Sequence, residues 1–309
     1  MGNAEKSATG CRFCGGSLAD VVDLGMSPRC ERLLAADQLD RVETFYPLKV
    51  KVCERCFLMQ LPHRPGDDDG TLAGAADLND FVAGIRLQLA PDGVATVEFP
   101  HLLRLIAENQ YDAIYRERIF YFALATAERV FAAHGLRVFD VAEIRAGGGS
   151  LRVSLCRETS DRPTNARVAE IKASEAAAGL DRLAGFAGFA EQVRQARWNL
   201  MDFLIRAKWY GKSVVAYGAP GNGNALLNHA GIRPDIVDYA VDRDPCKHGC
   251  FTPGTRIPVA PPARVRETRP DYLLILPWTL KHEIMATHGY IRDWGGQFVV
   301  PIPDLTLFP

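Results

Sequence analysis

Residues 97–122 read VEFPHLLRLIAENQYDAIYRERIFYF, and this stretch decides how the central part of the chain folds. Its first residues alternate apolar and acidic side chains up to Pro100, which has no amide hydrogen for a sheet ladder, so we expect a strand that ends there. Apolar side chains then recur at helical spacing from Leu102 to Ile106, which predicts a short helix. The stretch therefore indicates an α/β unit in which a strand leads directly into a helix.

A polar string, Tyr115-Arg116-Glu117-Arg118, interrupts the apolar and aromatic residues of the same stretch. Polar groups against aromatic surroundings are typical of a small, partly buried site. Tyr115, Glu117 and the nearby His101 are candidate catalytic residues because tyrosine, glutamate and histidine are common general acids and bases. A charged turn that only covers core residues explains the same string equally well.

The composition points to an ordinary globular chain. It has 309 residues, 36 basic and 37 acidic side chains and 48% hydrophobic content, enough for two or three domains. The net charge of −1 gives no reason to expect nucleic acid or an anionic membrane as a partner. No apolar run is long enough to span a membrane, and the polar start lacks a secretory signal, so we expect a cytoplasmic protein.

Two Cys-x-x-Cys pairs form the most specific pattern in the chain. Cys11 with Cys14, and Cys53 with Cys56, each place two thiolates on one side of a tight turn, and two such turns provide the four sulfur ligands that Zn²⁺ prefers. Four thiolates fill the coordination sphere, so we predict a structural zinc ion, with a small β-rich segment between the pairs. Cys30, between them, is expected to be a spectator or a core thiol.

The middle of the chain alternates predicted linkers, helices and strands. Residues 63–70, with proline, glycines and three aspartates, have the composition of a linker. Helices are expected over residues 80–89 and 125–134. Strands are expected over residues 136–144 and 151–156, joined by a glycine-rich loop. In that loop Gly148, Gly149 and Ser150 are candidate substrate-binding residues because glycine lets the backbone approach a ligand, although a plain hairpin loop is the alternative.

The order of predicted helices and strands in the C-terminal half is typical of a parallel α/β domain. Residues 165–211 are predicted to form two helices broken around residues 185–188. A buried strand over residues 213–217 leads through a glycine-rich turn into a helix over residues 225–230, and further strands are expected over residues 236–241, 272–276 and 298–302. This order predicts a parallel sheet whose ligands gather at the carboxyl ends of the strands.

The glycine-rich turn is a candidate phosphate-binding site, since such turns offer backbone N–H groups at the positive end of a helix. Asp242 lies at about the distance at which dinucleotide-binding folds keep a ribose-binding acid, but the order of the glycines departs from that fingerprint, so NAD binding is a weak prediction. For Cys246 and Cys250 the sequence does not decide between a thiol or metal function and an exposed turn. The substrate-binding candidates here are Tyr217, Gly218, Asn222, Gly223 and Asn224.

The chain resembles the zinc-containing C-methyltransferases that act on nucleotide-linked keto-deoxysugars in antibiotic biosynthesis and use S-adenosylmethionine (SAM). The resemblance implies an α/β protein with a zinc-binding module over residues 1–65, a truncated Rossmann-type methyltransferase domain over 66–164 and a C-terminal Rossmann-like domain over 165–309. The motifs that carry it are the cysteine pairs, Tyr46-Pro47-Leu48, Met59-Gln60-Leu61, Glu98-Phe99-Pro100-His101, Gly148-Gly149-Ser150, Tyr217-Gly218-Ala219, Arg269-Pro270-Asp271-Tyr272, Leu276-Pro277-Trp278 and Trp294-Gly295-Gly296.

The chain departs from this family in length and in its central string. Family members carry roughly a hundred more residues, the size of one domain, and the missing part falls between residues 69 and 80. That part contains the loop that holds SAM, so SAM binding is not expected. The family reads Tyr-His-Glu-His where this chain has Arg116 and Arg118 in place of the histidines. Arginine stays protonated and cannot act as a base, but its guanidinium group can bind a phosphate or carboxylate of the substrate.

Three functions follow from these features. The first is SAM-independent acid/base chemistry on a nucleotide-linked keto-sugar, such as isomerisation, epimerisation or elimination. The second is cyclisation or rearrangement of a different natural-product intermediate in the same cleft, and the third is a non-catalytic accessory subunit. In each case we expect a small-molecule ligand, and a homo-oligomer or complex that covers the truncated central domain.

Overall fold

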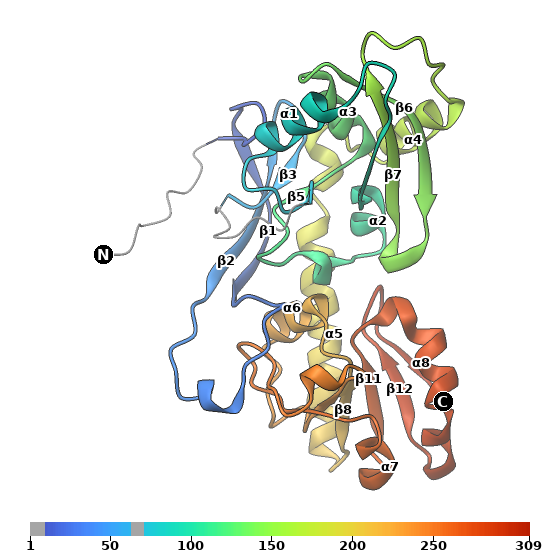
Figure 1. Cartoon of the computed structure of the whole chain (residues 1–309). Coiled ribbons are helices and arrows are strands. Elements are labelled where there is room, and N and C mark those ends of the chain that lie inside the picture. The colour runs from blue at the N-terminus through green and yellow to red at the C-terminus, as the bar shows by residue number, and fades with distance from the viewer. Residues whose placement is uncertain (1–9, 63–70) are drawn as a thin grey trace. The chain divides into compact units, whose positions relative to one another are not determined.

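A computed structural model of the protein describes residues 10–62 and 71–309, which form two compact units (Figure 1). Unit 1 consists of Met1–Asp23, Lys49–Ala107 and Glu117–Ala190, and unit 2 consists of Leu24–Leu48, Glu108–Arg116 and Glu191–Pro309. The predicted linker over residues 63–70 and the polar start of the chain lie outside the described residues. The domain limits expected from the sequence remain a prediction.

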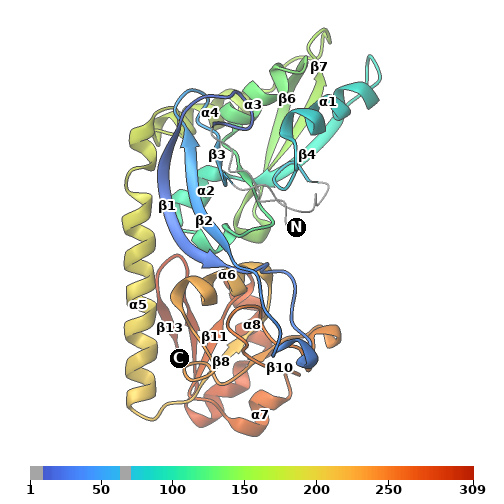
Figure 2. The same ribbon diagram turned by 90° about the vertical axis from the view of Figure 1, so that its left-hand side faces the viewer.

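Three strands of the N-terminal segment and β5, from farther along the chain, form a four-stranded sheet in the order β1-β2-β3-β5. Its longest strands, β1 and β2, lie side by side and curve together (Figure 2). Both belong to the segment between the two cysteine pairs, so the prediction of a β-rich segment there is confirmed. The bounds are β1 Leu18–Ser27, β2 Tyr46–Cys53, β3 Met59–Gln60 and β5 Phe120–Tyr121.

A second sheet of unit 1 has three strands in the order β4-β7-β6, and β7 is antiparallel to both neighbours. The predicted strands of the central region are confirmed, and their glycine-rich connection turns through Gly147, Gly148 and Gly149, all with positive φ. Helices α3 and α4 pack on β6. The bounds are β4 Ala95–Pro100, β6 Leu136–Ile144, β7 Ser150–Arg157, α1 Leu78–Gln88, α2 Leu102–Ala107, α3 Leu124–Ala132 and α4 Ala166–Ala177.

Unit 2 contains a six-stranded sheet in the order β10-β9-β8-β11-β12-β13, in which all pairs are parallel except that of β12 with β13. The predicted parallel sheet is confirmed. The strand expected over residues 236–241 is shorter, because Ile236 and Val237 donate backbone hydrogen bonds to the Arg233 carbonyl and so lie in a turn. The bounds are β8 Val214–Tyr217, β9 Ala240–Val241, β10 Val259–Ala260, β11 Tyr272–Ile275, β12 Gln297–Val300 and β13 Thr306–Phe308.

The strand order of this sheet reverses between β8 and β11. From β8 the chain proceeds to β9 and β10 on one side, and then returns to β11 and β12 on the other. Such a reversal leaves a crevice at the carboxyl ends of the two central strands, where α/β proteins bind ligands. The helices of this part of the chain are α5 Phe189–Trp209, α6 Gly221–Ala230, α7 Arg264–Thr268 and α8 Lys281–Thr287. None of the described helices is both long and apolar enough to cross a membrane.

Helix α6 begins at Gly221, four residues before the predicted start at residue 225. Pro220 is its N-cap residue and accepts a backbone hydrogen bond from Asn224. Glycine is required at two nearby positions by close packing. A Cβ at Gly218 would lie 2.6 Å from Cδ of Pro277, and one at Gly223 would lie 2.8 Å from Cβ of Leu276. The turn after β8 is therefore packed against the residues that follow β11.

Candidate functional site

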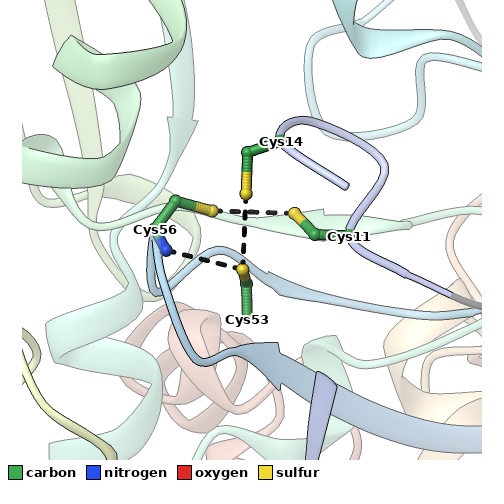
Figure 3. Close-up of side chains that lie close together, drawn as sticks. All are labelled: Cys11, Cys14, Cys53 and Cys56. Atoms are coloured by element: carbon green, nitrogen blue, oxygen red, sulfur yellow. Dashed lines mark hydrogen bonds between the residues drawn. The ribbon is translucent and has the colours of Figure 1, made fainter. Parts of the chain in front are cut away.

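Four thiols of unit 1 converge on one point (Figure 3). The sulfur atoms of Cys11, Cys14, Cys53 and Cys56 all lie within 4.8 Å of one another. The Cys11–Cys56 and Cys14–Cys53 separations are 3.6 Å and 3.5 Å. Sulfurs bound tetrahedrally to Zn²⁺ at about 2.3 Å are about 3.8 Å apart, so the cluster has the size of a zinc cage. The predicted four-cysteine metal site is confirmed.

Hydrogen bonds from neighbouring groups fix these sulfurs. The backbone N–H groups of Arg55 and Cys56 lie 3.4 Å from the Cys53 sulfur, and buried Gln60 donates to the Cys11 sulfur at 3.2 Å. The hydrogen bond between Cys11 and Cys56 has opposite effects on the two thiols. It holds the pKa of Cys11 below its usual value and raises the pKa of Cys56. Since four sulfurs complete the coordination of zinc, the ion has a structural role here.

A buried carboxylate lies where the strand order of unit 2 reverses. Asp112, in the 3₁₀ helix η2 (Tyr111–Ala113), is 1% exposed. Its Oδ2 accepts hydrogen bonds from Nδ2 of Asn222 at 2.9 Å and from Nε1 of Trp278 at 2.8 Å. Asn222 lies in the first turn of α6 and Trp278 follows β11, so Asp112 joins both sides of the crevice. The two donors compensate for the desolvation of the charge.

Tyr115 and Glu31 form a hydrogen-bonded pair at the start of α6. The Tyr115 hydroxyl donates to Oε1 of Glu31 at 3.0 Å. Tyr115 is buried and packs with Cys30 and Ala225, whereas Glu31 is exposed. A Cβ at Gly221 would lie 2.8 Å from Cγ of Glu31, so the glutamate lies against the helix start, where the helix dipole favours a negative charge. A phenol next to an exposed carboxylate can transfer protons.

Sequence reasoning selected Tyr115 and Asn222 but missed Glu31, Asp112 and Trp278. Glu31 is 84 residues from Tyr115 in the chain, and no local pattern joins the two. Trp278 stands in the family string Leu276-Pro277-Trp278, which was the one available signal. The missed residues are those whose role depends on contacts between distant segments.

Several other candidates of unit 2 are buried in its packing. Arg116 is 3% exposed, and its guanidinium carbon lies 4.3 Å from the ring centroid of Tyr46. Asn224 is fully buried and donates to the carbonyl of Cys30 at 2.7 Å. Cys30 itself is fully buried, which confirms the expectation of a core thiol. Tyr217, at the end of β8, is half-buried, and its ring lies 4.8 Å from that of His288.

Asp242, the acid associated with NAD binding, is occupied by groups of its own domain. It accepts hydrogen bonds at 2.9 Å from the backbone N–H groups of Ala219 and Asp244 and from the ammonium group of Lys247. Burial raises the pKa of this carboxyl, but the hydrogen-bond donors lower it by more. The pKa of Asp242 therefore lies below its ordinary value. NAD binding stays a prediction that this geometry does not favour.

The remaining candidates lie in unit 1. His101 is 3% exposed, and its Nε2 is 2.8 Å from Oε1 of Glu175. Glu175 also accepts hydrogen bonds from the first backbone N–H groups of α3, so it orients His101 and caps that helix. The backbone N–H of His101 donates to the carbonyl of Gly149 at 3.1 Å. This bond brings the loop with Gly148, Gly149 and Ser150 next to His101.

Glu117 and Arg118 are half-buried residues of unit 1. The Arg118 carbonyl accepts a hydrogen bond from the Tyr121 hydroxyl at 2.8 Å. The structure thus brings the loop of residues 148–150 next to His101 in unit 1, and Tyr115 and Asn222 to the start of α6 in unit 2. Their catalytic and substrate-binding roles remain predictions.

Family models of known proteins match the N-terminal and the C-terminal parts of the chain. A family model described as a C-methyltransferase C-terminal domain matches residues 145–303, and a model of a putative zinc-binding domain matches residues 11–68. The C-methyltransferase NovU of Streptomyces niveus is 34% identical over 228 residues, which make up 74% of this chain and 54% of NovU. The chain therefore spans about half the length of this curated relative.

The fold and the metal site define a zinc-binding α/β protein with a parallel, Rossmann-like sheet. Together with the matches, they place the chain in the zinc-containing C-methyltransferase family. The resemblance drawn from the sequence is thereby confirmed.

Gly16→Ala is expected to weaken zinc binding about tenfold, because overpacking of this kind costs about 1–3 kcal/mol. A Cβ at this position would lie 3.0 Å from the Cys53 sulfur and 3.4 Å from the Cys14 sulfur, and would displace both. Competition with a chromogenic chelator measures the affinity. Gly84→Ala, in α1, is the matched control because its Cβ meets no atom within 4 Å. Equal affinities in the two variants would contradict the geometry of the cluster.

Asp112→Ala is expected to lower the free energy of unfolding by about 3 kcal/mol, because two buried donors lose their acceptor. Urea unfolding of the zinc-loaded protein measures the change. The control is Asp37→Ala, which removes an exposed carboxylate paired with Arg41 and should cost less than about 0.5 kcal/mol. If the two substitutions have equal effects, Asp112 does not hold the crevice together.

Proposed function

We propose that this protein binds a nucleotide-linked keto-deoxysugar and moves protons at the carbon next to the ketone without using SAM. The observation that carries the proposal is the Tyr115–Glu31 hydrogen bond of 3.0 Å at the start of α6. This pair stands beside the crevice at the carboxyl ends of β8 and β11, the usual ligand position in such a sheet. Membership of the C-methyltransferase family supports a carbon next to a carbonyl group as the reacting position.

The two residues have complementary tasks in such a reaction. The exposed carboxylate of Glu31 takes the proton from the carbon next to the ketone, and the bond electrons move into an enolate. Once Glu31 carries the proton, the Tyr115 hydroxyl leaves its bond to Glu31 and donates a hydrogen bond to the developing oxyanion, which it stabilises. Return of a proton from solvent completes an exchange, and its return to the opposite face inverts the carbon.

The strands of unit 1 pair differently from those of unit 2. Over residues 10–62 and 71–309, parallel pairing of named strands occurs only in the six-stranded sheet of unit 2. The glycine-rich turn of that sheet is packed against Leu276 and Pro277. The proposal therefore assigns no SAM site to these sheets, and independence from SAM stays part of the proposal.

His101 and Glu117 remain proposed alternatives for the base. His101 is held by Glu175 through the nitrogen that faces it, and Glu117 is half-buried. The function in which Arg116 and Arg118 clamp an anionic intermediate gains no support from Arg116, whose guanidinium group is buried against Tyr46. A non-catalytic accessory role is separated from the proposal by the experiment below.

The proposal predicts deuterium uptake. Incubation of the zinc-loaded protein with a thymidine diphosphate-linked 4-keto-6-deoxysugar in D₂O should label the carbon next to the ketone without added SAM, as followed by NMR. Tyr115→Phe and Glu31→Gln should each slow labelling by about 10²-fold or more, the usual contribution of general acid/base groups.

Tyr239→Phe is the matched control, because this hydroxyl is also hydrogen-bonded in unit 2 but to Thr268, away from the crevice. It should label at the wild-type rate. If labelling is kept in Glu31→Gln but lost in Glu117→Gln or His101→Asn, the residue whose substitution abolishes labelling is the base, and Glu31 is not. No labelling by the wild type would reject the proposed chemistry.

A further inference from the structure

Helix α5 presents a stripe of large apolar side chains to solvent. Trp198, Ile205 and Trp209 are 55%, 53% and 85% exposed. Their spacings of seven and four residues place them on one face of the helix. Leu200, Leu204 and Ala207, on the opposite face, are buried and already anchor the helix. The exposed stripe is therefore surplus to the packing of α5.

An apolar stripe of this size on an exposed helix marks an interaction surface. Two tryptophans on one face are the side chains most enriched at the centres of protein interfaces. Charged side chains lie along the same face, and their order distinguishes between the partners that could cover it. Glu191 is paired with Arg194, and Asp202 is paired with Arg206 at 2.9 Å, so acids and bases alternate along the same face.

A second copy of α5 complements this pattern when the two helices run antiparallel. With a two-fold axis between Met201 and Asp202, the numbers of two residues that face each other across the axis add up to 403. Trp198 then faces Ile205 of the partner subunit, and Arg194 faces Trp209 of the partner subunit, where its guanidinium group can stack on the ring.

A parallel pairing fails the same comparison. It places Glu191 opposite Glu191 and Arg194 opposite Arg194, and like charges across an interface oppose association. In the antiparallel arrangement Asp202 lies nearest the axis, where its own Arg206 neutralises it. Self-complementarity of one patch is what a two-fold interface requires.

We propose that two copies of this protein associate through an antiparallel α5–α5 contact centred between Met201 and Asp202. The contact buries Trp198, Ile205 and Trp209 of both copies. It does not depend on the proposed catalytic function. It lies on residues 198–209 of unit 2 and is distinct from the cover of the truncated central domain that the sequence predicts.

Light scattering after size exclusion tests the association. The zinc-loaded full chain should have twice the monomer mass of 34.0 kDa at micromolar concentration. The double variant Trp198→Glu/Trp209→Glu should be monomeric, with a dissociation constant raised at least tenfold and unchanged circular dichroism. Leu87→Glu is the matched control, because Leu87 is an 83% exposed apolar residue on α1, outside the stripe, and this variant should remain dimeric.

Cysteine crosslinking tests the direction and register of the pair. Asp202→Cys should form a disulfide-linked dimer on mild oxidation, above the level seen with the wild-type cysteines. Gln195→Cys should not, because its two copies would be displaced by about 20 Å along the helices. A monomeric wild type, a dimer that persists in the tryptophan double variant, or efficient crosslinking through residue 195 would each overturn the proposal.

Discussion

The carboxylate of Asp112 fixes the part of unit 2 in which the candidate site is built. It is 1% exposed, and this burial is tolerated because Asn222 and Trp278 both donate to one of its oxygens. The bonds tie the segment that leads into Tyr115 to both sides of the strand reversal. Unit 1 uses the same device. Glu175, also 1% exposed, joins His101 to the start of α3. In each unit a buried acid holds a predicted site residue in a single orientation.

The sequence predicted the features that local chemistry determines. The cysteine pairs define the zinc site because each knuckle is complete within four residues, and β8 follows from a short apolar run. The start of α6 was predicted too late because glycine and asparagine are poor helix formers, whereas the Pro220 cap and packing on Leu276 override that preference. The Tyr115–Glu31 pair was not predictable, since it joins residues 84 positions apart.

Family membership and local geometry support different parts of the functional account. The matches assign the zinc segment and the C-terminal domain, but one fold serves many reactions, and activity must be argued from the site itself. The glycines after β8 look like a phosphate cradle in the sequence, yet close contacts with Leu276 and Pro277 give them a packing role. Near the start of α6 lie the hydrogen-bonded side chains of Tyr115 and Glu31, together with Asn222, whose amide is held by Asp112.

The central proposal is that this chain binds a nucleotide-linked keto-sugar and does not use the methyl donor. Isothermal titration of the zinc-loaded protein with a thymidine diphosphate-linked 4-keto-6-deoxysugar and, separately, with SAM tests it most directly. The account predicts saturable binding of the sugar nucleotide and no heat of binding with SAM. Binding of SAM, or a protein that binds neither compound, would contradict it.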